Sequence, residues 1–344
     1  MRDKFLVGIT PDFYTDAKGY FEGPVHEVFA NAPLVDAGPM PPQPDNIGTP
    51  EALNRYDAIV NLALHVTSQS LRGVERLVIV ARWGVGYDRI DVAALTQADA
   101  VLSITPGGVR APVAEAILAF AFALSKHMFQ LDRMTRAGKW RDELRELGGD
   151  IRGSVLGSIG FGNIARELFR IARPLSFSRL LACDPFVTKA QAGEIGVELV
   201  DMDAIFRESD FVCVNTLLND STRGLVGERQ FRMMKPTAYF INTARGPIVQ
   251  HQALVRALKE KWIAGAGIDV FPTEPAPPND PLYELDNVIL APHALAWTRN
   301  IMHDNGIEAC GHVMRIACGE IPDSVVNREV LDRPGFRKKL ERYR

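Results

Sequence analysis

The residues with the clearest chemical meaning form a glycine-rich turn between two runs of apolar residues. Residues 155–159 are apolar and partly β-branched, as in a buried strand, and Gly160-x-Gly162-x-x-Ala165 opens a run with helical spacing. Gly160 allows a tight turn, Gly162 lets the backbone approach a phosphate, and Ala165 lets the helix pack close to the strand. The N–H groups at the start of such a helix point at an anion. The stretch predicts a pyrophosphate site that includes Asn163 and Ile164.

An acidic residue further along the chain extends the prediction from a pyrophosphate site to a dinucleotide site. Asp184 follows Gly162 by 22 positions, after a second apolar run at 180–183. An acid in that place binds the ribose 2′-hydroxyl, and its charge repels a 2′-phosphate. The sequence therefore predicts NAD as the cofactor, with NADP less favoured.

Three further stretches place a titratable side chain directly after an apolar run. They contain Arg245 in Asn-Thr-Ala-Arg-Gly, Glu274 in Asp-Val-Phe-Pro-Thr-Glu-Pro, and His293 in Leu-Ala-Pro-His. Singly, each has an ordinary explanation: a surface ion pair, an exposed turn acid and a loop histidine. Ligands of doubly wound sheets bind at the carboxyl ends of the strands. Because all three follow predicted strands in a chain with a dinucleotide turn, we expect one shared site.

The ordered set of motifs resembles the D-isomer-specific 2-hydroxyacid dehydrogenase family, which includes glyoxylate/hydroxypyruvate reductases and phosphoglycerate dehydrogenases. The matching motifs are the glycine turn, Asn-Thr-Ala-Arg-Gly, Asp-Val-Phe-x-x-Glu-Pro, Pro-His, Gly-Val-Gly-Tyr-Asp at 84–88 and Val-Ala-Glu at 113–115. The resemblance covers nearly the whole chain and is weakest before about residue 75 and after about residue 320. Two departures stand out: Leu217 replaces a proline common in relatives, and no arginine lies near Ser125-Lys126.

The resemblance implies a catalytic role for each of the three titratable side chains. His293 would be the general acid/base, because imidazole exchanges a proton near neutral pH. Glu274 would orient His293 and favour its protonated form. Arg245 would bind the substrate carboxylate and carbonyl oxygen, which a guanidinium fork matches.

The resemblance also implies further contacts to cofactor and substrate. The N–H groups of Val85 and Gly86 would hold the other edge of the substrate carboxylate, and Asp269 would bind the nicotinamide carboxamide. His65 and Trp83 are candidates for the substrate pocket, although packing explains Trp83 equally well. We expect a small 2-oxo acid such as glyoxylate or hydroxypyruvate. Additional cofactor contacts are expected from Thr216, Thr222, Thr243 and Ala244.

The elements around these motifs predict an α/β fold with two domains. A Rossmann-type doubly wound parallel sheet is expected to be inserted in a smaller flavodoxin-like α/β domain. Residues 1–110 plus 297–344 would form the substrate-binding domain, and 111–296 the NAD-binding domain. The pattern also predicts a loop over 31–50, one long helix over 112–134, a final helix over 299–317 and a solvated basic tail over 334–344.

Composition narrows the class of protein. A net charge of −3 over 344 residues gives no reason to expect nucleic acid or a membrane as partner. The four cysteines are widely spaced, which favours free thiols over disulfides or a metal site. The most apolar segment, 116–125, is shorter than a bilayer requires, and no signal peptide is visible. We therefore expect a cytoplasmic protein. The resemblance implies a homodimer that pairs through the helix at 112–134, although packing between the domains would also satisfy the apolar surface of that helix.

Two other functions fit the same dinucleotide motif. A protein of this fold could sense NAD(H) and assemble partners as a co-repressor does, without turnover. A relative could also oxidise formate or phosphite, but the further pocket residues for that chemistry are not identifiable in the sequence.

Overall fold

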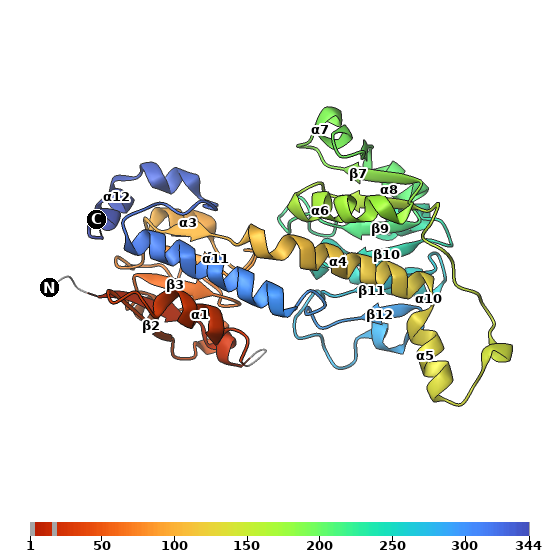
Figure 1. Cartoon of the computed structure of the whole chain (residues 1–344), viewed down its shortest axis with the longest axis horizontal. Helices are drawn as coiled ribbons and strands as arrows, with labels where there is room; N and C mark the ends of the chain where they lie inside the picture. Colours follow the sequence, from red (N-terminus) through yellow and green to blue (C-terminus); the bar gives the residue numbers. More distant parts are fainter. Residues whose placement is uncertain (1–3, 16–18, 344) are drawn as a thin grey trace. The chain divides into compact units, whose positions relative to one another are not determined.

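The computed structural model describes residues 4–15 and 19–343, and the chain divides into two compact units. Unit 1 comprises Met1–Val109 and Trp297–Arg344, and unit 2 comprises Arg110–Ala296. The first division falls inside helix α4 (Pro106–Ser125), and the second precedes helix α11 (Arg299–Ala317). Each unit has its own parallel sheet (Figure 1).

Unit 1 is built on a five-stranded parallel sheet in the order β2-β1-β3-β4-β5. This is the flavodoxin-like order, and it agrees with the fold predicted for the smaller domain. The central strands are apolar on both faces because helices cover both sides of a parallel sheet. The strands are β1 (Phe5–Ile9), β2 (Val35–Pro39), β3 (Ala58–Asn61), β4 (Ile79–Arg82) and β5 (Val101–Ser103). The other α-helices are α1 (Glu22–Phe29), α2 (Pro50–Leu53), α3 (Val92–Gln97) and α12 (Pro334–Glu341).

Unit 2 is built on a seven-stranded parallel sheet in the order β12-β11-β10-β9-β6-β7-β8. The chain runs from β6 to one edge and then from β9 to the other, so the order reverses between β6 and β9. The predicted Rossmann-type doubly wound sheet is thereby confirmed. Its strands are β6 (Val155–Ile159), β7 (Arg179–Cys183), β8 (Glu198–Leu199), β9 (Phe211–Val214), β10 (Tyr239–Asn242), β11 (Gly265–Ile268) and β12 (Val288–Leu290). Its helices after α4 are α5 (Met128–Arg136), α6 (Asn163–Ala172), α7 (Lys189–Gly193), α8 (Met202–Glu208), α9 (Glu228–Met233) and α10 (His251–Lys259).

The loop predicted over 31–50 contains strand β2, so that prediction was wrong. β2 pairs with β1 from Val35 to Pro39 and forms the edge of the sheet. Its sequence, Val-Asp-Ala-Gly-Pro, lacks the apolar run of a buried strand. An edge strand has only one neighbour and tolerates glycine and proline, which hides it from pattern analysis.

The single long helix predicted over 112–134 is two helices in the structure, which together begin earlier and end later than predicted. α4 begins at Pro106 and ends at Ser125, and His127 then takes a left-handed backbone conformation with φ +50° before α5. α4 is long and apolar enough to cross a bilayer, contrary to the shorter length expected, but 56% of its apolar window is buried inside the protein. A core helix of a globular domain has the same character.

The basic tail packs against unit 1, so the solvated end predicted for it was also wrong. In α12, Phe336 and Leu340 are buried. The Lys339 ammonium donates to the carbonyls of Leu77 at 2.8 Å and Ala98 at 2.7 Å. The charges that made the tail look solvated therefore include a buried, hydrogen-bonded lysine.

Lys339 gives a prediction for stability at alkaline pH. Burial lowers its pKa from 10.5 to about 8. Between those values the unfolded chain holds a proton that the folded chain has released, so the free energy of unfolding rises with pH, by up to about 3 kcal/mol. Urea unfolding at several pH values should show this rise in the wild type and not in Lys339→Met. Parallel pH profiles of the two proteins would contradict it.

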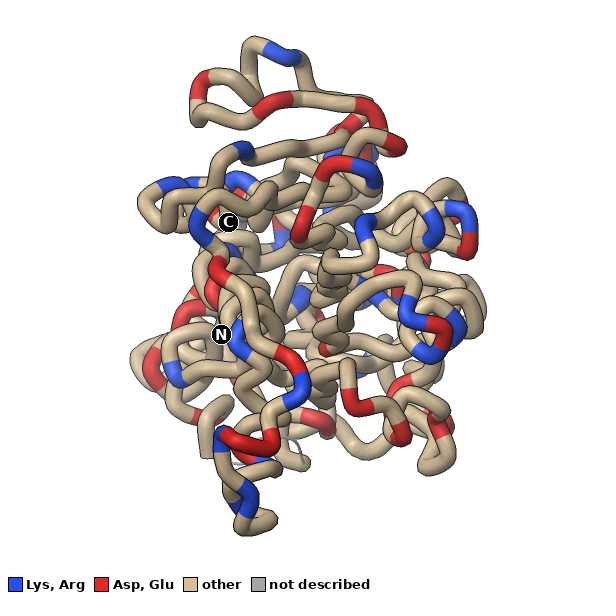
Figure 2. The backbone as a smooth tube through the Cα atoms, turned by 90° about the vertical axis from the view of Figure 1, so that its right-hand side faces the viewer, with Lys and Arg blue, Asp and Glu red and all other residues tan. Residues whose placement is uncertain are grey.

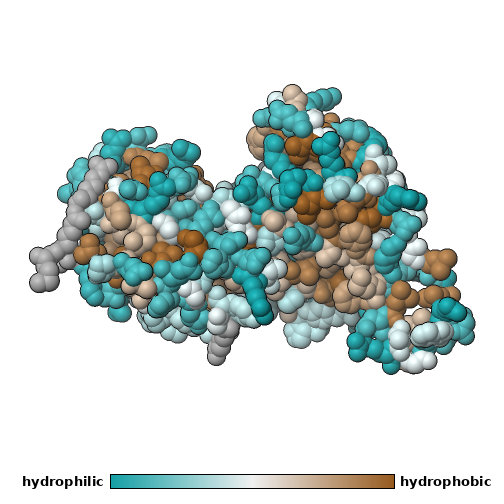
Figure 3. Space-filling model, in the orientation of Figure 1, coloured by the Kyte–Doolittle hydropathy of each residue, from teal (hydrophilic) through white to brown (hydrophobic). Residues whose placement is uncertain are grey.

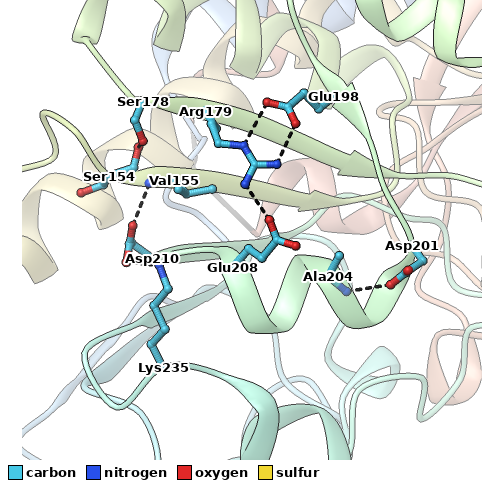
Figure 4. Close-up of polar contacts among 10 residues, drawn as sticks. All are labelled: Ser154, Val155, Ser178, Arg179, Glu198, Asp201, Ala204, Glu208, Asp210 and Lys235. Carbon is cyan, nitrogen blue, oxygen red and sulfur yellow. Dashed lines mark hydrogen bonds and ion pairs between the residues drawn. The ribbon is translucent and has the colours of Figure 1, made fainter.

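Ion pairs hold the amino ends of the strands in unit 2 (Figure 4). Arg179 of β7 binds Glu198 of β8 at 2.7 Å and Glu208 of α8 at 2.6 Å. Asp210 accepts from the Val155 N–H at 2.8 Å and pairs with Lys235 at 2.8 Å. These contacts lie at the sheet end opposite the predicted site. Elsewhere acidic and basic residues are interspersed along the chain (Figure 2).

Candidate active site

The glycine turn follows β6, where the strand order of unit 2 reverses. Gly160 has φ +98°, and a Cβ there would lie 2.6 Å from the Asn215 carbonyl oxygen after β9. Its N–H donates to the Cys183 carbonyl at 2.8 Å. Gly162 is the N-cap of α6, and no heavy atom lies within 4 Å of where its Cβ would be. The first glycine is required by the fold, and the second leaves open space at the helix N-terminus, beside Asn163.

Asp184 lies at the end of β7, next to this turn. Its two carboxylate oxygens accept from the N–H groups of Phe161 and Phe186, each at 2.9 Å. An ionised carboxylate has about four lone-pair positions, so acceptor capacity remains for a hydroxyl group. The arrangement fits a ribose held beside a pyrophosphate.

Asn242 organises the loop after β10 that carries Arg245. Its side chain accepts from the Ala244 N–H and donates to the Arg245 carbonyl, both at 3.0 Å. Arg245 is half-buried and donates to the Ala244 carbonyl at 2.7 Å. The Thr243 hydroxyl is buried without a hydrogen-bond partner among the described residues, so it has capacity for a cofactor group. The motif contained Asn242, but the sequence analysis gave it no role.

The loops after β10 and β11 cross where Gly246 follows Arg245. A Cβ on Gly246 would lie 2.0 Å from the Phe271 carbonyl carbon and 2.5 Å from the Pro272 nitrogen. Only glycine permits this approach. It brings the loop of Arg245 against the loop of Glu274.

Glu274 and His293 form a direct pair. His293 Nδ1 lies 2.8 Å from Glu274 Oε2, and Glu274 Oε1 accepts from the Phe271 N–H at 3.1 Å. The side chains are 41% and 23% exposed, respectively. His293 has φ +56°, and Asp269 Oδ1 holds the residues after it by accepting from the N–H groups of Ala294 and Leu295 at 3.0 and 3.2 Å. The imidazole is thus oriented on one side and reachable on the other.

The charges of this group favour an ionised Glu274. Burial opposes ionisation, but the hydrogen bond and charge of His293, the Phe271 N–H and the charge of Arg245 lower the pKa of Glu274 below its usual value. Burial raises the pKa of Asp269, although the N–H groups that it binds favour its ionised form. Within unit 2, the charges of Arg245 and His293 therefore both act on Glu274.

The loop with Val85 and Gly86 lies in unit 1, after β4. Arg82 donates to the carbonyl of Gly86 at 2.8 Å and also to that of Trp83. Gly84 has φ +121° and makes two hydrogen bonds with Thr105. The Thr105 hydroxyl accepts from the Gly84 N–H at 2.7 Å, and the Thr105 N–H donates to the Gly84 carbonyl at 3.0 Å. In the described part of the chain, no hydrogen bond uses the N–H of Val85 or Gly86. Two donors thus stay available for a carboxylate.

Three other predicted residues make contacts of their own. Trp83 is 3% exposed and packs edge-on against Phe13, with the ring centroids 4.8 Å apart, as expected for a core residue. His65 is half-buried, and burial together with the charge of Arg89 lowers its pKa. The Thr222 hydroxyl closes its own loop by donating to the Leu217 carbonyl at 2.6 Å.

Comparison with known proteins gives consistent matches. The family model described as the NAD-binding domain of D-isomer specific 2-hydroxyacid dehydrogenases matches residues 118–294. A glyoxylate reductase of Korarchaeum cryptofilum is 37% identical over 83% of this chain and 88% of its own length. The crystal structure of a glyoxylate reductase from Paecilomyes thermophila has a TM-score of 0.81 at 25% identity, over 96% of this chain and 100% of that one. An NAD-complexed D-isomer specific 2-hydroxyacid dehydrogenase from Lactobacillus delbrueckii ssp. bulgaricus has a TM-score of 0.74 at 20% identity, over 94% and 100% of the two chains, and supports the fold.

Proposed function

The chain belongs to the D-isomer-specific 2-hydroxyacid dehydrogenase family, and we propose that it reduces a small 2-oxo acid such as glyoxylate or hydroxypyruvate to the D-2-hydroxy acid, or catalyses the reverse oxidation. The family match makes it an NAD-dependent oxidoreductase of 2-oxo and 2-hydroxy acids. The observation that carries the proposal is the His293–Glu274 pair at 2.8 Å beside the loop of Arg245. All three follow strands of the dinucleotide-binding sheet.

The cofactor contacts in this proposal come from unit 2. The pyrophosphate lies at Gly162 and the first N–H groups of α6, and Asp184 binds the adenosine ribose. Bound NADH supplies the hydride for the carbonyl carbon. Thr243, with its buried hydroxyl, and Asp269 are the groups we assign to the nicotinamide end. Thr216, Thr222, Ala244, Asn163 and Ile164 complete the proposed cofactor site.

The substrate chemistry follows from three side chains. His293 gives a proton to the carbonyl oxygen from Nε2, because its Nδ1 is bonded to Glu274. Arg245 binds the carboxylate and stabilises the charge that develops on the carbonyl oxygen. The N–H groups of Val85 and Gly86 bind the carboxylate's other edge. Of the two predicted domains, we assign residues 1–110 and 297–344 to substrate binding and 111–296, which also carries Arg245, Glu274 and His293, to cofactor binding.

The deciding experiment follows the loss of NADH absorbance with a panel of 2-oxo acids. Glyoxylate, hydroxypyruvate, pyruvate and branched-chain 2-oxo acids are compared, with NADPH in parallel. Turnover of one class establishes the enzyme and its substrate. A protein that binds NADH and turns over none of them would overturn the proposal and favour an NAD(H) sensor.

Asp184 is expected to set the preference for NADH over NADPH. Asp184→Ala removes a charge that repels a 2′-phosphate and a charged acceptor for the ribose hydroxyl. The ratio of kcat/KM for NADH to that for NADPH should fall at least about tenfold, since one hydrogen bond to a charged group is worth ~1.5–3 kcal/mol. Steady-state kinetics with both cofactors measures this. An unchanged ratio would assign the discrimination to other residues.

We also propose that the chain forms a homodimer through the segment around α5. Large apolar side chains are exposed there, and Figure 3 shows hydrophobic surface along the neighbouring α4. Contiguous exposed apolar surface marks interaction sites. The exposed residues are Phe122, Met128, Phe129, Leu131, Trp140, Leu144 and Leu147. Light scattering should give twice the 38.0 kDa of one chain; a mass of one chain would disprove the dimer.

A further inference from the structure

A half-buried histidine and a buried carboxylate form a pair in unit 2 outside the residues assigned above. His251 is the first residue of α10, and Asp280 is the N-cap of a short 3-10 turn, η6 (Pro281–Glu284). His251 Nε2 lies 3.1 Å from Asp280. Their side chains are 19% and 4% exposed. A buried carboxylate is costly unless it is paired and hydrogen-bonded, so this contact must be maintained for the local fold.

Asp280 is held rigidly at its own position. Its Oδ1 also accepts from the Leu282 N–H at 2.9 Å, and its backbone N–H donates to the Pro277 carbonyl at 3.1 Å. Leu282 is fully buried in the core of unit 2. On the other side, the Gln250 N–H donates to the Val226 carbonyl at 2.8 Å and fixes the start of α10. The pair therefore connects two anchored points.

The place of the pair along the chain links it to the active site. His251 comes six residues after Arg245, and Asp280 comes six residues after Glu274. The loops of Arg245 and Glu274 approach each other closely where Gly246, directly after Arg245, meets Phe271, three residues before Glu274. The His251–Asp280 contact joins their downstream ends. The segment that carries Glu274 is thereby attached to the loop of Arg245 on both sides of Glu274, at Phe271 before it and at Asp280 after it.

We propose that His251 and Asp280 are positioning residues that hold Glu274 in the geometry needed for the reaction, a role that rests on the function proposed above. The segment between Phe271 and Asp280 contains four prolines and no helix or strand. Its path is set by its attachments at the two ends. Loss of the downstream attachment lets Glu274 move from His293 Nδ1, and a displacement of about 1 Å costs up to about 100-fold in rate.

The test compares His251→Gln, Asp280→Asn and the double variant with a control on the same helix. Gln keeps a donor at 251, and Asn keeps an acceptor for the Leu282 N–H. Arg256→Gln removes two exposed ion pairs of α10, with Glu228 and Glu260, and is the matched control. Steady-state kinetics gives kcat and KM for the 2-oxo acid, fluorescence quenching gives the Kd for NADH, and thermal unfolding gives Tm.

We expect kcat to fall about 10- to 100-fold in both single variants, with the Kd for NADH changed less than about twofold. Gly162 and Asp184, which we assign to the pyrophosphate and the adenosine ribose, follow the strands β6 and β7 and lie outside the segment that carries Glu274, so a positioning defect separates kcat from the main part of cofactor binding. The double variant should lose no more than the worse single variant, because the two residues act as one unit. Arg256→Gln should behave as the wild type.

Two results would overturn the proposal. One is near wild-type kcat in His251→Gln and Asp280→Asn; the other is a loss of kcat matched by an equal loss of NADH affinity, as general destabilisation gives. A wild-type protein that reduces no 2-oxo acid would instead reject the proposed function, and the positioning role would be rejected with it. Failure of His251→Gln to fold leaves Asp280→Asn as the deciding variant.

Discussion

Replacement of His293 by Asn is expected to lower kcat by about 10²–10⁴-fold, which is the contribution of a positioned general acid. Asn keeps a polar side chain of similar reach but cannot deliver a proton to the carbonyl oxygen. The Kd for NADH should stay within about twofold, because His293 is assigned no cofactor contact. Stopped-flow single turnovers and NADH titration measure the two quantities separately.

The matched control for this variant is His303→Asn in unit 1. His303 is exposed and also contacts carboxylates, those of Asp304 at 3.0 Å and Glu27 at 3.3 Å. Its replacement should leave kcat unchanged. A His293→Asn protein with kcat within tenfold of the wild type would show that another group supplies the proton.

The role assigned to Glu274 has a pH consequence. Its pKa lies below the usual value because the hydrogen bond and charge of His293, with Arg245, outweigh burial. Interaction with ionised Glu274 is therefore complete above the ordinary carboxyl range and is lost as the pH falls through that lowered pKa. Glu274 limits turnover only under acid conditions.

The second large effect is expected at the glycine turn, where two glycines should fail in different ways. Gly160→Ala places a Cβ 2.6 Å from a backbone oxygen at a residue with φ +98°. It should lower the free energy of unfolding by ~1–3 kcal/mol or more. Gly162→Ala meets no atom within 4 Å and has no positive φ, so its stability should be near that of the wild type.

Gly162→Ala is nevertheless expected to weaken NADH binding about 100-fold, or ~3 kcal/mol. Its Cβ would stand in the space that we assign to the pyrophosphate, whereas the free protein has nothing there to clash. Calorimetric titration with NADH and urea unfolding of both variants provide the comparison. Gly193→Ala in α7, also without a neighbour within 4 Å, is the control. Undiminished NADH affinity in Gly162→Ala would place the pyrophosphate elsewhere.

The sequence alone determined the strand–turn–helix at residues 155–165, the sheet that follows it and the family. These features depend on local signals: apolar runs of strand length, glycines at fixed spacing and short motifs after strands. For the same reason, Arg245, Glu274 and His293 were identifiable as a set before their positions were known.

Local pattern failed where the outcome depended on distant partners. Strand β2 forms as the edge neighbour of β1. The basic tail packs on the rest of unit 1 with Phe336 and Leu340 buried and with Lys339 bonded to the carbonyls of Leu77 and Ala98. The break between α4 and α5 falls at His127, which carries no proline or glycine signal.

Only the tertiary structure decided how the site is assembled. Gly246 belonged to a recognised motif but had no role in the sequence analysis; the structure supplies one, because a Cβ there would lie 2.0 Å from the Phe271 carbonyl carbon. Asn242 and the His251–Asp280 pair likewise acquire meaning only from contacts across loops. Residue spacing along one chain encodes strands, turns and helix starts, because these form between neighbours. The approach of two loops is set by the packing of the whole sheet, which no short stretch of sequence contains.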